Sequence, residues 1–585
     1  MSDHGSSSTV SAAGQVLPAF ALARARNSLG KWALSSVIIG ALAFYVLYPL
    51  ALIIINSFNV ANLGEPEVFG FQAWEKAFHN PKIIESLWNT IKVGVVVLAI
   101  ALPFSAFIAW LIGRTNLPFA HGFEFFFWVS FLMPTLATTF GWITLLDPST
   151  GLINKALADI PFLSWLNFDI YSFSGIIWGH LMANGISTKV MLLTPAFRRM
   201  DANYEEAGRV SGTNALMTMI KITMPMMTPI LIVVFLLSLV RLFSTFEIEL
   251  LLGAPWGFYV YSTKIVSLAR ETPPLLNQAA ALGCVTLVFL GAFIPLQKWL
   301  IRRRSYTTVT GQFRPALVDL GAWKIPATIF VSLVVILLVA VPLVSTIGSS
   351  FMVHFGAFNL PKTWTLEYWQ RGLSNPELLR SLKNTLIIAT TAAAIGPLLF
   401  SMFAYVIVRS KLPGRGLLDT LCWIPSAIPG VLAGLGILWL VLGTPLFSPL
   451  YGTLFLMTVV SLLGGLTLST QILKANFIQL GKDMEEAARI SGAGFWRTYF
   501  TVVLPIMAQT MILIALIKFM YAAEHTSSTI LLASSQTMTL ALLTLEQVAY
   551  GYYEQASVSI IMILILTVGL GLLGRVFGLK VGIHT

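Results

Sequence analysis

The charged residues of this chain are few, and they fall in two kinds of place where they could do chemistry. The first is a polar stretch that occurs twice, with matching positions 280 residues apart. The copies read Glu205-Glu206-Ala207-Gly208-Arg209-Val210-Ser211-Gly212 and Glu485-Glu486-Ala487-Ala488-Arg489-Ile490-Ser491-Gly492. Because the chain is 56% hydrophobic and only 10% charged, a polar stretch kept twice at one offset favours a functional role. The alternative is an ordinary capped surface helix in a loop.

Each copy has the pattern of a short helix, a stop and a second short helix. Asp201 or Asn203, and Asp483 in the second copy, are candidates for the N-cap, which places the glutamates in the first turn. Gly212 and Gly492 suit a left-handed position at the helix C-terminus. We therefore expect a short helix standing across the end of an apolar segment.

The second kind of place is inside the apolar segments. One segment carries Arg241, Glu247 and Glu249, and a later one carries Lys518, Glu524 and His525. Ionisable groups at membrane depth are costly, and they usually face a bundle interior or a wet path. Two interpretations stay open: these residues line a path for a solute, or they form interhelical salt bridges, for instance between Arg241 and a glutamate.

Motifs for catalysis are missing from the sequence. The two Gly-Lys pairs, Gly30-Lys31 and Gly481-Lys482, lack the other residues of a phosphate-binding loop, so we expect no ATP hydrolysis by this chain. The two cysteines, Cys284 and Cys422, lie in apolar segments and are expected to be packing residues. We expect no catalytic residue, no metal ligand and no cofactor.

The elements around these residues are predicted to be membrane-spanning helices. The mean hydropathy is +0.81, and many charge-free runs reach the roughly 20 residues that a helix needs to cross hydrocarbon. We count twelve spans, six in each half of the chain. Their centres lie near residues 43, 101, 135, 182, 240, 287, 336, 396, 430, 462, 518 and 566. The fold class expected is an all-α membrane protein.

Internal similarity divides the chain into two halves. Asn80-Pro81 matches Asn375-Pro376 at an offset of 295, which falls to 280 at the duplicated stretch, so the first half carries extra residues. They fit the segment 147–169, where residues 151–158 could form a short helix. Six spans per half give two parallel repeats with the pore on their common axis. The expected boundaries are a tail (1–30), a first half (31–305), a linker (306–324) and a second half (325–580).

Most Lys and Arg residues fall on one side of these spans. The positive-inside rule then places both termini and both duplicated stretches in the cytoplasm. The net charge of +11 reflects this topology and the anionic membrane lipid, so nucleic-acid binding is not expected.

The duplicated stretches carry a resemblance to a known family. The spacing of Glu206-Ala207, Gly212, Ile222 and Pro225, and of Glu486-Ala487-Ala488, Gly492, Val502 and Pro505, resembles the signature loop of ABC-importer membrane subunits. Gly208 departs from it, because it replaces the family's second alanine. The segments 246–253, 524–532 and 551–556 resemble the fused, double-length permeases of the ferric-iron group, whose relatives carry polyamines, thiamine or 2-aminoethylphosphonate.

The resemblance implies a type I importer permease in the bacterial inner membrane. It implies that each stretch is a coupling helix that docks on a separate ATPase subunit, two copies in all, and that a periplasmic binding protein delivers the solute. The coupling residues would be Glu205, Glu206, Ala207 and Gly212, and Glu485, Glu486, Ala487 and Gly492. The translocation path would include Arg241, Glu247, Lys518, Glu524 and His525.

Other functions remain as alternatives. Ferric iron is the solute that the resemblance favours, and 2-aminoethylphosphonate, a polyamine or thiamine would use the same machinery. An ion-coupled secondary transporter is also built from two parallel halves, but it has no use for the duplicated loops. An intramembrane enzyme would need a convergent set of catalytic residues that the sequence does not show.

Overall fold

The part of the protein that the structure describes is largely helical. The computed structural model describes residues 13–61, 66–200, 203–303, 317–357 and 361–576. Within these ranges only isolated β-bridges occur besides the helices. Helices suit such apolar segments, because a helix satisfies its backbone polar groups internally where no water can do so. The predicted all-α fold is confirmed.

The expected spans all correspond to helices. Six helices are long and apolar enough to cross a membrane, and four further pairs of helices qualify as spans that are bent. The other two expected spans fall on the run from Phe173 to Arg198 and on the helix Leu276–Arg303. Length and composition thus make the chain a multi-pass membrane protein of two six-helix repeats.

The first half runs from α1 to α14. Its elements are α1 (Ala13–Ser57), α2 (Gln72–His79), α3 (Pro81–Arg114), α4 (Ala120–Leu132), α5 (Thr135–Leu146), α6 (Leu152–Ala158), α7 (Phe173–His180), η1 (Leu181–Gly185), α8 (Ser187–Arg198), α9 (Asn203–Val210), α10 (Ala215–Thr218), η2 (Met219–Thr223), α11 (Met224–Arg241), η3 (Leu242–Ser244), α12 (Glu247–Leu252), η4 (Ala254–Trp256), α13 (Tyr261–Ala269) and α14 (Leu276–Arg303).

The second half repeats this order. Its elements are η5 (Gly321–Trp323), α15 (Lys324–Val335), η6 (Ile336–Ala340), α16 (Val341–Ser349), α17 (Glu367–Ser374), α18 (Pro376–Arg409), α19 (Arg415–Trp423), η7 (Ile424–Ala427), α20 (Gly430–Gly443), η8 (Ser448–Leu450), α21 (Leu454–Leu463), α22 (Leu466–Gln479), α23 (Asp483–Ile490), α24 (Phe495–Thr498), η9 (Tyr499–Val503), α25 (Leu504–Ile506), α26 (Ala508–Glu524), α27 (Leu540–Ala549), α28 (Tyr553–Leu564), η10 (Ile565–Gly569) and α29 (Leu570–Val576).

Repeated sequence signals give repeated helices. The longest pair, α3 and α18, has 34 residues in each copy and opens with the same signal. The side chains of Asn80 and Asn375 accept hydrogen bonds from the backbone N–H of Lys82 and Glu377, and a proline follows each asparagine. This is a favourable helix start, because proline lacks the N–H that would go unpaired there. The short helix expected in the first half's extra segment is also present, as α6.

Each half packs its first spanning helix against the third span of the other half. A side chain at Gly141 of α5 would lie 2.5 Å from the carbonyl oxygen of Pro342 in α16, and Gly436 of α20 has the same relation to Pro49 of α1. Glycine at these positions therefore lets two backbones approach closely. The two halves are interlocked. The domain boundaries stay a prediction, and the tail 1–12 and residues 304–316 lie outside the described residues.

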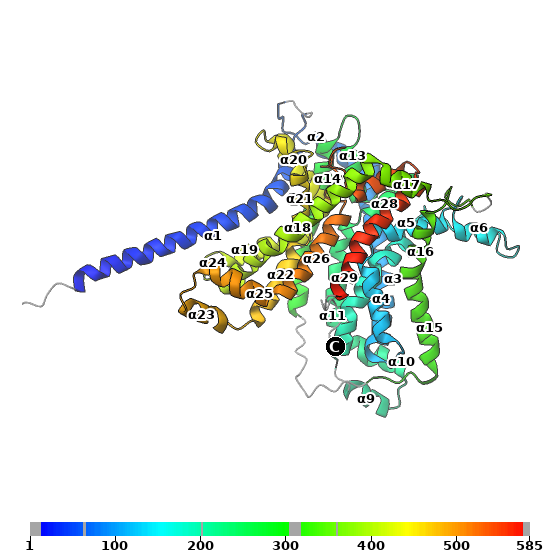
Figure 1. Cartoon of the computed structure of the whole chain (residues 1–585), viewed down its shortest axis with the longest axis horizontal. Coiled ribbons are helices and arrows are strands. Elements are labelled where there is room, and N and C mark those ends of the chain that lie inside the picture. The colour runs from blue at the N-terminus through cyan, green and yellow to red at the C-terminus, as the bar shows by residue number, and fades with distance from the viewer. Residues whose placement is uncertain (1–12, 62–65, 201–202, 304–316, 358–360, 577–585) are drawn as a thin grey trace, which may run out of the picture.

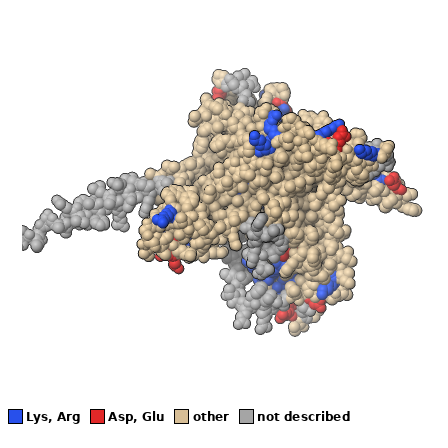
Figure 2. Space-filling view, viewed as in Figure 1, with Lys and Arg blue, Asp and Glu red and all other residues tan. Residues whose placement is uncertain are grey.

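The molecule has two legs, and each leg also contains the first spanning helix of the other half: α1 lies against α19 and α20, and α15 lies against α4. Figure 1 shows the legs meeting at the end where α2, α13, α17 and α20 lie and diverging toward α9 in one leg and α23 in the other. We call the ends that carry α9 and α23 the leg ends. On the face seen in Figure 2, the visible charged side chains gather at the two extremities of the molecule, with a wide band nearly free of charge between them.

Several spans are broken. The third span bends by 96° between α4 and α5, and its counterpart by 110° before α20; each break falls at a proline, Pro134 or Pro429. The fifth span differs between the halves. It is continuous from Leu216 to Leu239, but in the second half it bends by 79° just after Ile506. Pro505 lies in the short helix α25, before the bend, and the spanning helix α26 begins at Ala508.

Candidate functional site

Both leg ends carry a helix of eight residues from the duplicated stretch, α9 and α23. Each is followed by a glycine in the left-handed region, with φ of +84° at Gly212 and +83° at Gly492. The expected helix, stop and second helix is thus present twice. Asp483 is not the N-cap of α23; it is the first helical residue, and Lys482 precedes it without a side-chain cap. Asp201 and the side chain of Asn203 lie outside the described residues.

The paired glutamates of each stretch point in opposite directions. Glu205 and Glu485 are buried, with exposed fractions of 3% and 9%, whereas Glu206 and Glu486 are exposed. Residues one apart on a helix lie about 100° apart, which explains the difference. Ala487 is exposed beside Glu486, and the side chain of Ala207 lies outside the described residues. Only the second glutamate of each pair is free to meet a partner.

A large apolar side chain is also exposed on each helix. Val210 at the end of α9 is 89% exposed, and Ile490 at the end of α23 is 87% exposed. The two residues are equivalent by the 280-residue offset. One exposed aliphatic residue is ordinary on a protein surface, but Val210 and Ile490 recur beside an exposed glutamate at the same place in both legs.

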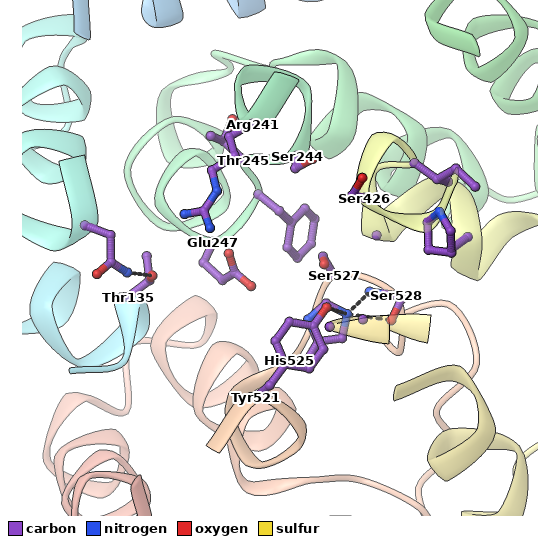
Figure 3. Close-up of a pocket in the computed structure, with 18 of the residues that line it drawn as sticks. Thr135, Arg241, Ser244, Thr245, Glu247, Ser426, Tyr521, His525, Ser527 and Ser528 are labelled. Atoms are coloured by element: carbon purple, nitrogen blue, oxygen red, sulfur yellow. Dashed lines mark hydrogen bonds between the residues drawn. The ribbon is translucent and has the colours of Figure 1, made fainter. Parts of the chain in front are cut away.

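A cavity of about 650 Å³ lies between the two halves. Its lining includes α1, α3 and the places where spans three, four and five are broken or end, in both copies. These include Thr135, Asn184, Gly185, Arg241, Glu247, Pro425, Ser426, Gly464, Gly465, Lys518, Tyr521, Glu524 and His525. Irregular backbone at membrane depth is tolerated where protein buries it or where it lines a cavity. Figure 3 shows Arg241 and Glu247 facing Tyr521 and His525 across this space.

Two carboxylates of the cavity bind the opposite half. Glu247 accepts a hydrogen bond from the hydroxyl of Thr526, with 2.5 Å between the oxygens. Glu524 accepts one from the backbone N–H of Thr135, the first residue of α5, at 2.8 Å. A carboxylate is favourable there, because the N-terminus of a helix carries partial positive charge. Each half therefore contributes one acidic side chain that bridges the seam.

The cations of the cavity have different surroundings. Lys518 is fully buried, and its ammonium group donates to the carbonyl oxygens of Ser461, at 2.8 Å, and Gly464. Arg241 is exposed within the cavity lining and, among the residues that the structure describes, forms no ion pair with a glutamate. The suggested pairing of Arg241 with a glutamate is not observed in these ranges.

The two histidines of the cavity have partners within their own half. His180 Nε2 lies 2.8 Å from Oε1 of Glu249. His525 Nε2 lies 2.6 Å from the hydroxyl of Ser528, and its ring stacks on Tyr521 with the centroids 4.5 Å apart. All five predicted path residues thus lie in one cavity, and in the described part of the chain Arg241 is the one whose side chain forms no hydrogen bond.

Some residues of the cavity were missed in the sequence. Thr135 follows the break at Pro134, and Ser426 and Gly430 flank the equivalent break at Pro429. A signal was available, because the two prolines are 295 residues apart and interrupt equivalent apolar runs. Asn184 could not have been found this way, because its position beside Thr135, 3.2 Å away, depends on how the spans pack.

Comparisons with known proteins find similar membrane subunits of transport systems. Residues 397–579 match the model "Binding-protein-dependent transport system inner membrane component". The chain is 25% identical to the putative ferric transport system permease protein FbpB 1 of Haemophilus influenzae, with 84% of this chain and 76% of the relative covered. It is 26% identical to the ferric transport system permease protein FbpB of Actinobacillus pleuropneumoniae, with 92% and 77% covered.

A solved structure is also similar. The chain aligns with the crystal structure of a bacterial ABC transporter involved in the import of alginate. The TM-score is 0.41 and the identity 17%, and the match covers 48% of this chain and 99% of that chain. The sequence comparisons, independently of this structure, show the resemblance of the chain to double-length ABC-importer permeases.

Proposed function

We propose that this chain, which resembles ABC-importer permeases over most of its length, is the membrane subunit of an ATP-driven importer for ferric iron. A separate ATPase hydrolyses ATP, and a periplasmic binding protein delivers the solute. The chain lies in the bacterial inner membrane with both termini in the cytoplasm, as the distribution of Lys and Arg favours.

One observation carries this proposal: the chain has two equivalent docking helices, one at each leg end, and one cavity shared by its halves. Glu206 with Val210, and Glu486 with Ile490, are exposed at the leg ends. Two equivalent surfaces fit two copies of one ATPase subunit. The central cavity, bounded by broken spans, fits a path that opens when the legs move. One copy of this chain per two ATPase subunits is the expected stoichiometry.

The name of the solute rests on the relatives and on the cavity. The two FbpB proteins are ferric transport permeases by name, and the name of the matching family model supports a binding protein as partner. The cavity offers Glu247, Glu524 and His525, oxygen and nitrogen groups suited to a hydrated or chelated ferric ion. Arg241 would suit an anionic chelator or a phosphonate, so 2-aminoethylphosphonate is the second candidate. Polyamines and thiamine follow.

Co-purification tests the docking part of this proposal. The full chain, expressed with its ATPase subunit, should retain two copies of it after affinity purification. Glu206→Arg and Glu486→Arg should each weaken the retention. Glu85→Arg is the matched control, because Glu85 is an exposed glutamate near the start of α3, at the opposite end of that helix from α9. Equal retention of the ATPase by all three variants would contradict the proposed docking sites.

Uptake measurements test the transport part. Vesicles that contain the chain, the ATPase and the binding protein should accumulate radioactive ferric iron only with ATP, whether or not an ion gradient is present. Uptake that follows an ion gradient without ATP would instead indicate a secondary transporter. Accumulation of labelled 2-aminoethylphosphonate, but not of iron, would keep the mechanism and change the solute.

A further inference from the structure

The first glutamate of the duplicated stretch has a partner inside the chain. In the first half, Nε and Nη2 of Arg114 lie 3.1 and 2.5 Å from Oε2 of Glu205. Nη1 of the same arginine donates to the carbonyl oxygen of Met200 at 2.8 Å. Arg114 is 1% exposed. This arginine is the last residue of α3, so the buried pair connects the docking helix α9 to the end of a 34-residue helix.

The second half has the equivalent pair. Nε of Arg409, the last residue of α18, lies 3.4 Å from Oε1 of Glu485, and Nη2 donates to the carbonyl oxygen of Leu480 at 2.5 Å. The arginines are 295 residues apart and the glutamates 280, so the pair is duplicated with the fold. Because the contact occurs at both leg ends, we infer that the Arg–Glu pair has the same structural role in each half.

The physical chemistry of the pair favours a fixed geometry. An arginine at a helix C-terminus is favourable, because the last carbonyl groups carry partial negative charge. A buried carboxylate needs its hydrogen bonds, and removing one partner leaves an uncompensated buried charge. Arg114 and Arg409 each bind both the glutamate and the backbone that leads into its helix, at Met200 or Leu480. Each arginine therefore fixes the docking helix and its entry together.

We propose that Arg114 and Arg409 are positioning residues, which hold the docking helices in a fixed pose on α3 and α18 through Glu205 and Glu485. This rests on the proposed function, since it assigns how ATPase movement enters the membrane domain. The first glutamate of each stretch belongs to this chain's interior, and only Glu206 and Glu486 are left for the ATPase. Movement of an ATPase subunit then reaches the second span of each half directly.

The two legs differ in the hydroxyl group that also donates a hydrogen bond to the buried glutamate. Glu205 also accepts from the hydroxyl of Thr223, at 2.7 Å, in the helical turn that continues into α11. The equivalent of Thr223 is Val503, and Glu485 accepts instead from Tyr405 of α18, at 2.8 Å. The first docking helix is thus tied to both α3 and the fifth span. In the described residues, Arg409 and Tyr405 bind Glu485 to α18, and the spanning helix α26 lies beyond the 79° bend.

A distance measurement on the full chain in lipid nanodiscs, without the ATPase, tests the pose. Spin labels replace Ile490 on α23 and Leu417 on α19, both exposed; Cys284 and Cys422 are buried, so the labels report the added cysteines. We expect one narrow distance distribution for the otherwise native chain and for Glu486→Gln. Glu485→Gln and Arg409→Gln should broaden it. Equal distributions for Glu485→Gln and Glu486→Gln would overturn the proposal.

Binding of the ATPase gives a second, independent readout. Glu485→Gln and Arg409→Gln should each weaken ATPase binding on the order of tenfold, within the usual range of coupling between sites. Combining them should weaken it by less than the sum of the two losses, because both variants remove the Arg409–Glu485 pair. Fully additive losses would overturn the proposal. Failure of the native chain to bind any ATPase would instead contradict the proposed function. The distance measurement would then still decide whether the arginines position the helices. Tyr405→Phe, which removes one hydroxyl only, serves if a charge variant does not fold.

Discussion

At the scale of single residues, Gly208 shows how the duplicated stretch adapted in one half. A side-chain carbon at position 208 would lie 2.4 Å from Cδ1 of Ile222. The equivalent positions in the second half are Ala488 and Val502, where the shorter valine leaves room for the alanine. The departure of Gly208 from the family's pattern is therefore compensation for the larger Ile222.

Gly208→Ala should gain less than the roughly 1 kcal/mol that alanine ordinarily adds over glycine in a helix, because the added methyl group forces the Ile222 side chain to move. Ile222→Val should raise the stability of that variant by recreating the second half's pair. Thermal unfolding of the detergent-solubilised chain measures both. The pair is compensatory only if Ile222→Val helps Gly208→Ala more than it helps the native chain.

The glycines after the docking helices have a different role. Gly492 has a φ of +83° and no atom within 4 Å of the position of an added Cβ. The cost of a side chain there comes from the backbone, about 1–2 kcal/mol for an ordinary residue in the left-handed region. Gly492→Val should therefore weaken ATPase binding clearly more than Gly492→Asn, because asparagine tolerates this conformation. Equal losses for both variants would mean that size, not backbone conformation, matters.

The sequence does not predict which glutamate of each pair is buried and which is exposed. Glu205 and Glu206 are adjacent and chemically alike, and the short helix is polar on most sides. Nothing in its pattern tells which carboxylate faces the protein, because that depends on the position of Arg114, 91 residues earlier. The prediction that the stretch is helical and ends at a left-handed glycine needed only local rules, and it is confirmed.

At the scale of elements, Lys518 supports a broken helix. α21 ends at Leu463 and α22 begins at Leu466 after a bend of 55°. The carbonyl groups at such an end have no helical partner, and the Lys518 ammonium group binds two of them. In the first half Lys189 donates to the carbonyl oxygen of Gly185, at the irregular part of the same span, at 2.8 Å. Each half thus places a lysine ammonium group at the irregular part of its fourth span.

Lys518→Met should lower the amount of folded chain rather than slow transport selectively, because each unpaired buried carbonyl costs about 1–3 kcal/mol. Lys189→Met is the matched variant, and it should cost less because Lys189 serves one carbonyl. Size-exclusion profiles and thermal unfolding of the purified variants give this order. If Lys518→Met is produced in normal yield but no longer supports uptake, Lys518 lines the translocation path and does not mainly stabilise the helix break.

The spans themselves could be predicted, but their breaks could not. Hydropathy depends on composition along the chain, so runs near residues 101 and 396 identify α3 and α18 directly. A run such as 125–146 stays apolar through Pro134, and hydropathy does not register the 96° bend there. The bend is stable because other helices pack around it and Glu524 caps the new helix start at Thr135. Such support comes from the other half of the molecule.

At the scale of the whole molecule, two of the cavity carboxylates form hydrogen bonds between the interlocked halves. Glu247 binds Thr526 of the second half, and Glu524 binds Thr135 of the first. Separation of the halves at this level would break both hydrogen bonds. The structure therefore indicates two roles for these carboxylates, a charged group of the path and a bond across the seam, and the two can be separated experimentally.

Glutamine separates these roles, because its carbonyl oxygen still accepts a hydrogen bond while its charge is gone. Glu247→Gln and Glu524→Gln should leave the amount of folded chain unchanged and slow ferric uptake, if the charge faces the solute. Thr526→Val removes the bond to Glu247 and keeps the charge, so it should raise ATP hydrolysis in the absence of the binding protein by loosening the seam. Radioactive iron uptake and ATPase rates in proteoliposomes measure these effects. If Glu247 and Arg241 were instead packing partners, Glu247→Gln would lose folded protein, and a change at Arg241 would then restore it. That outcome would contradict the described structure, in which the two side chains form no ion pair.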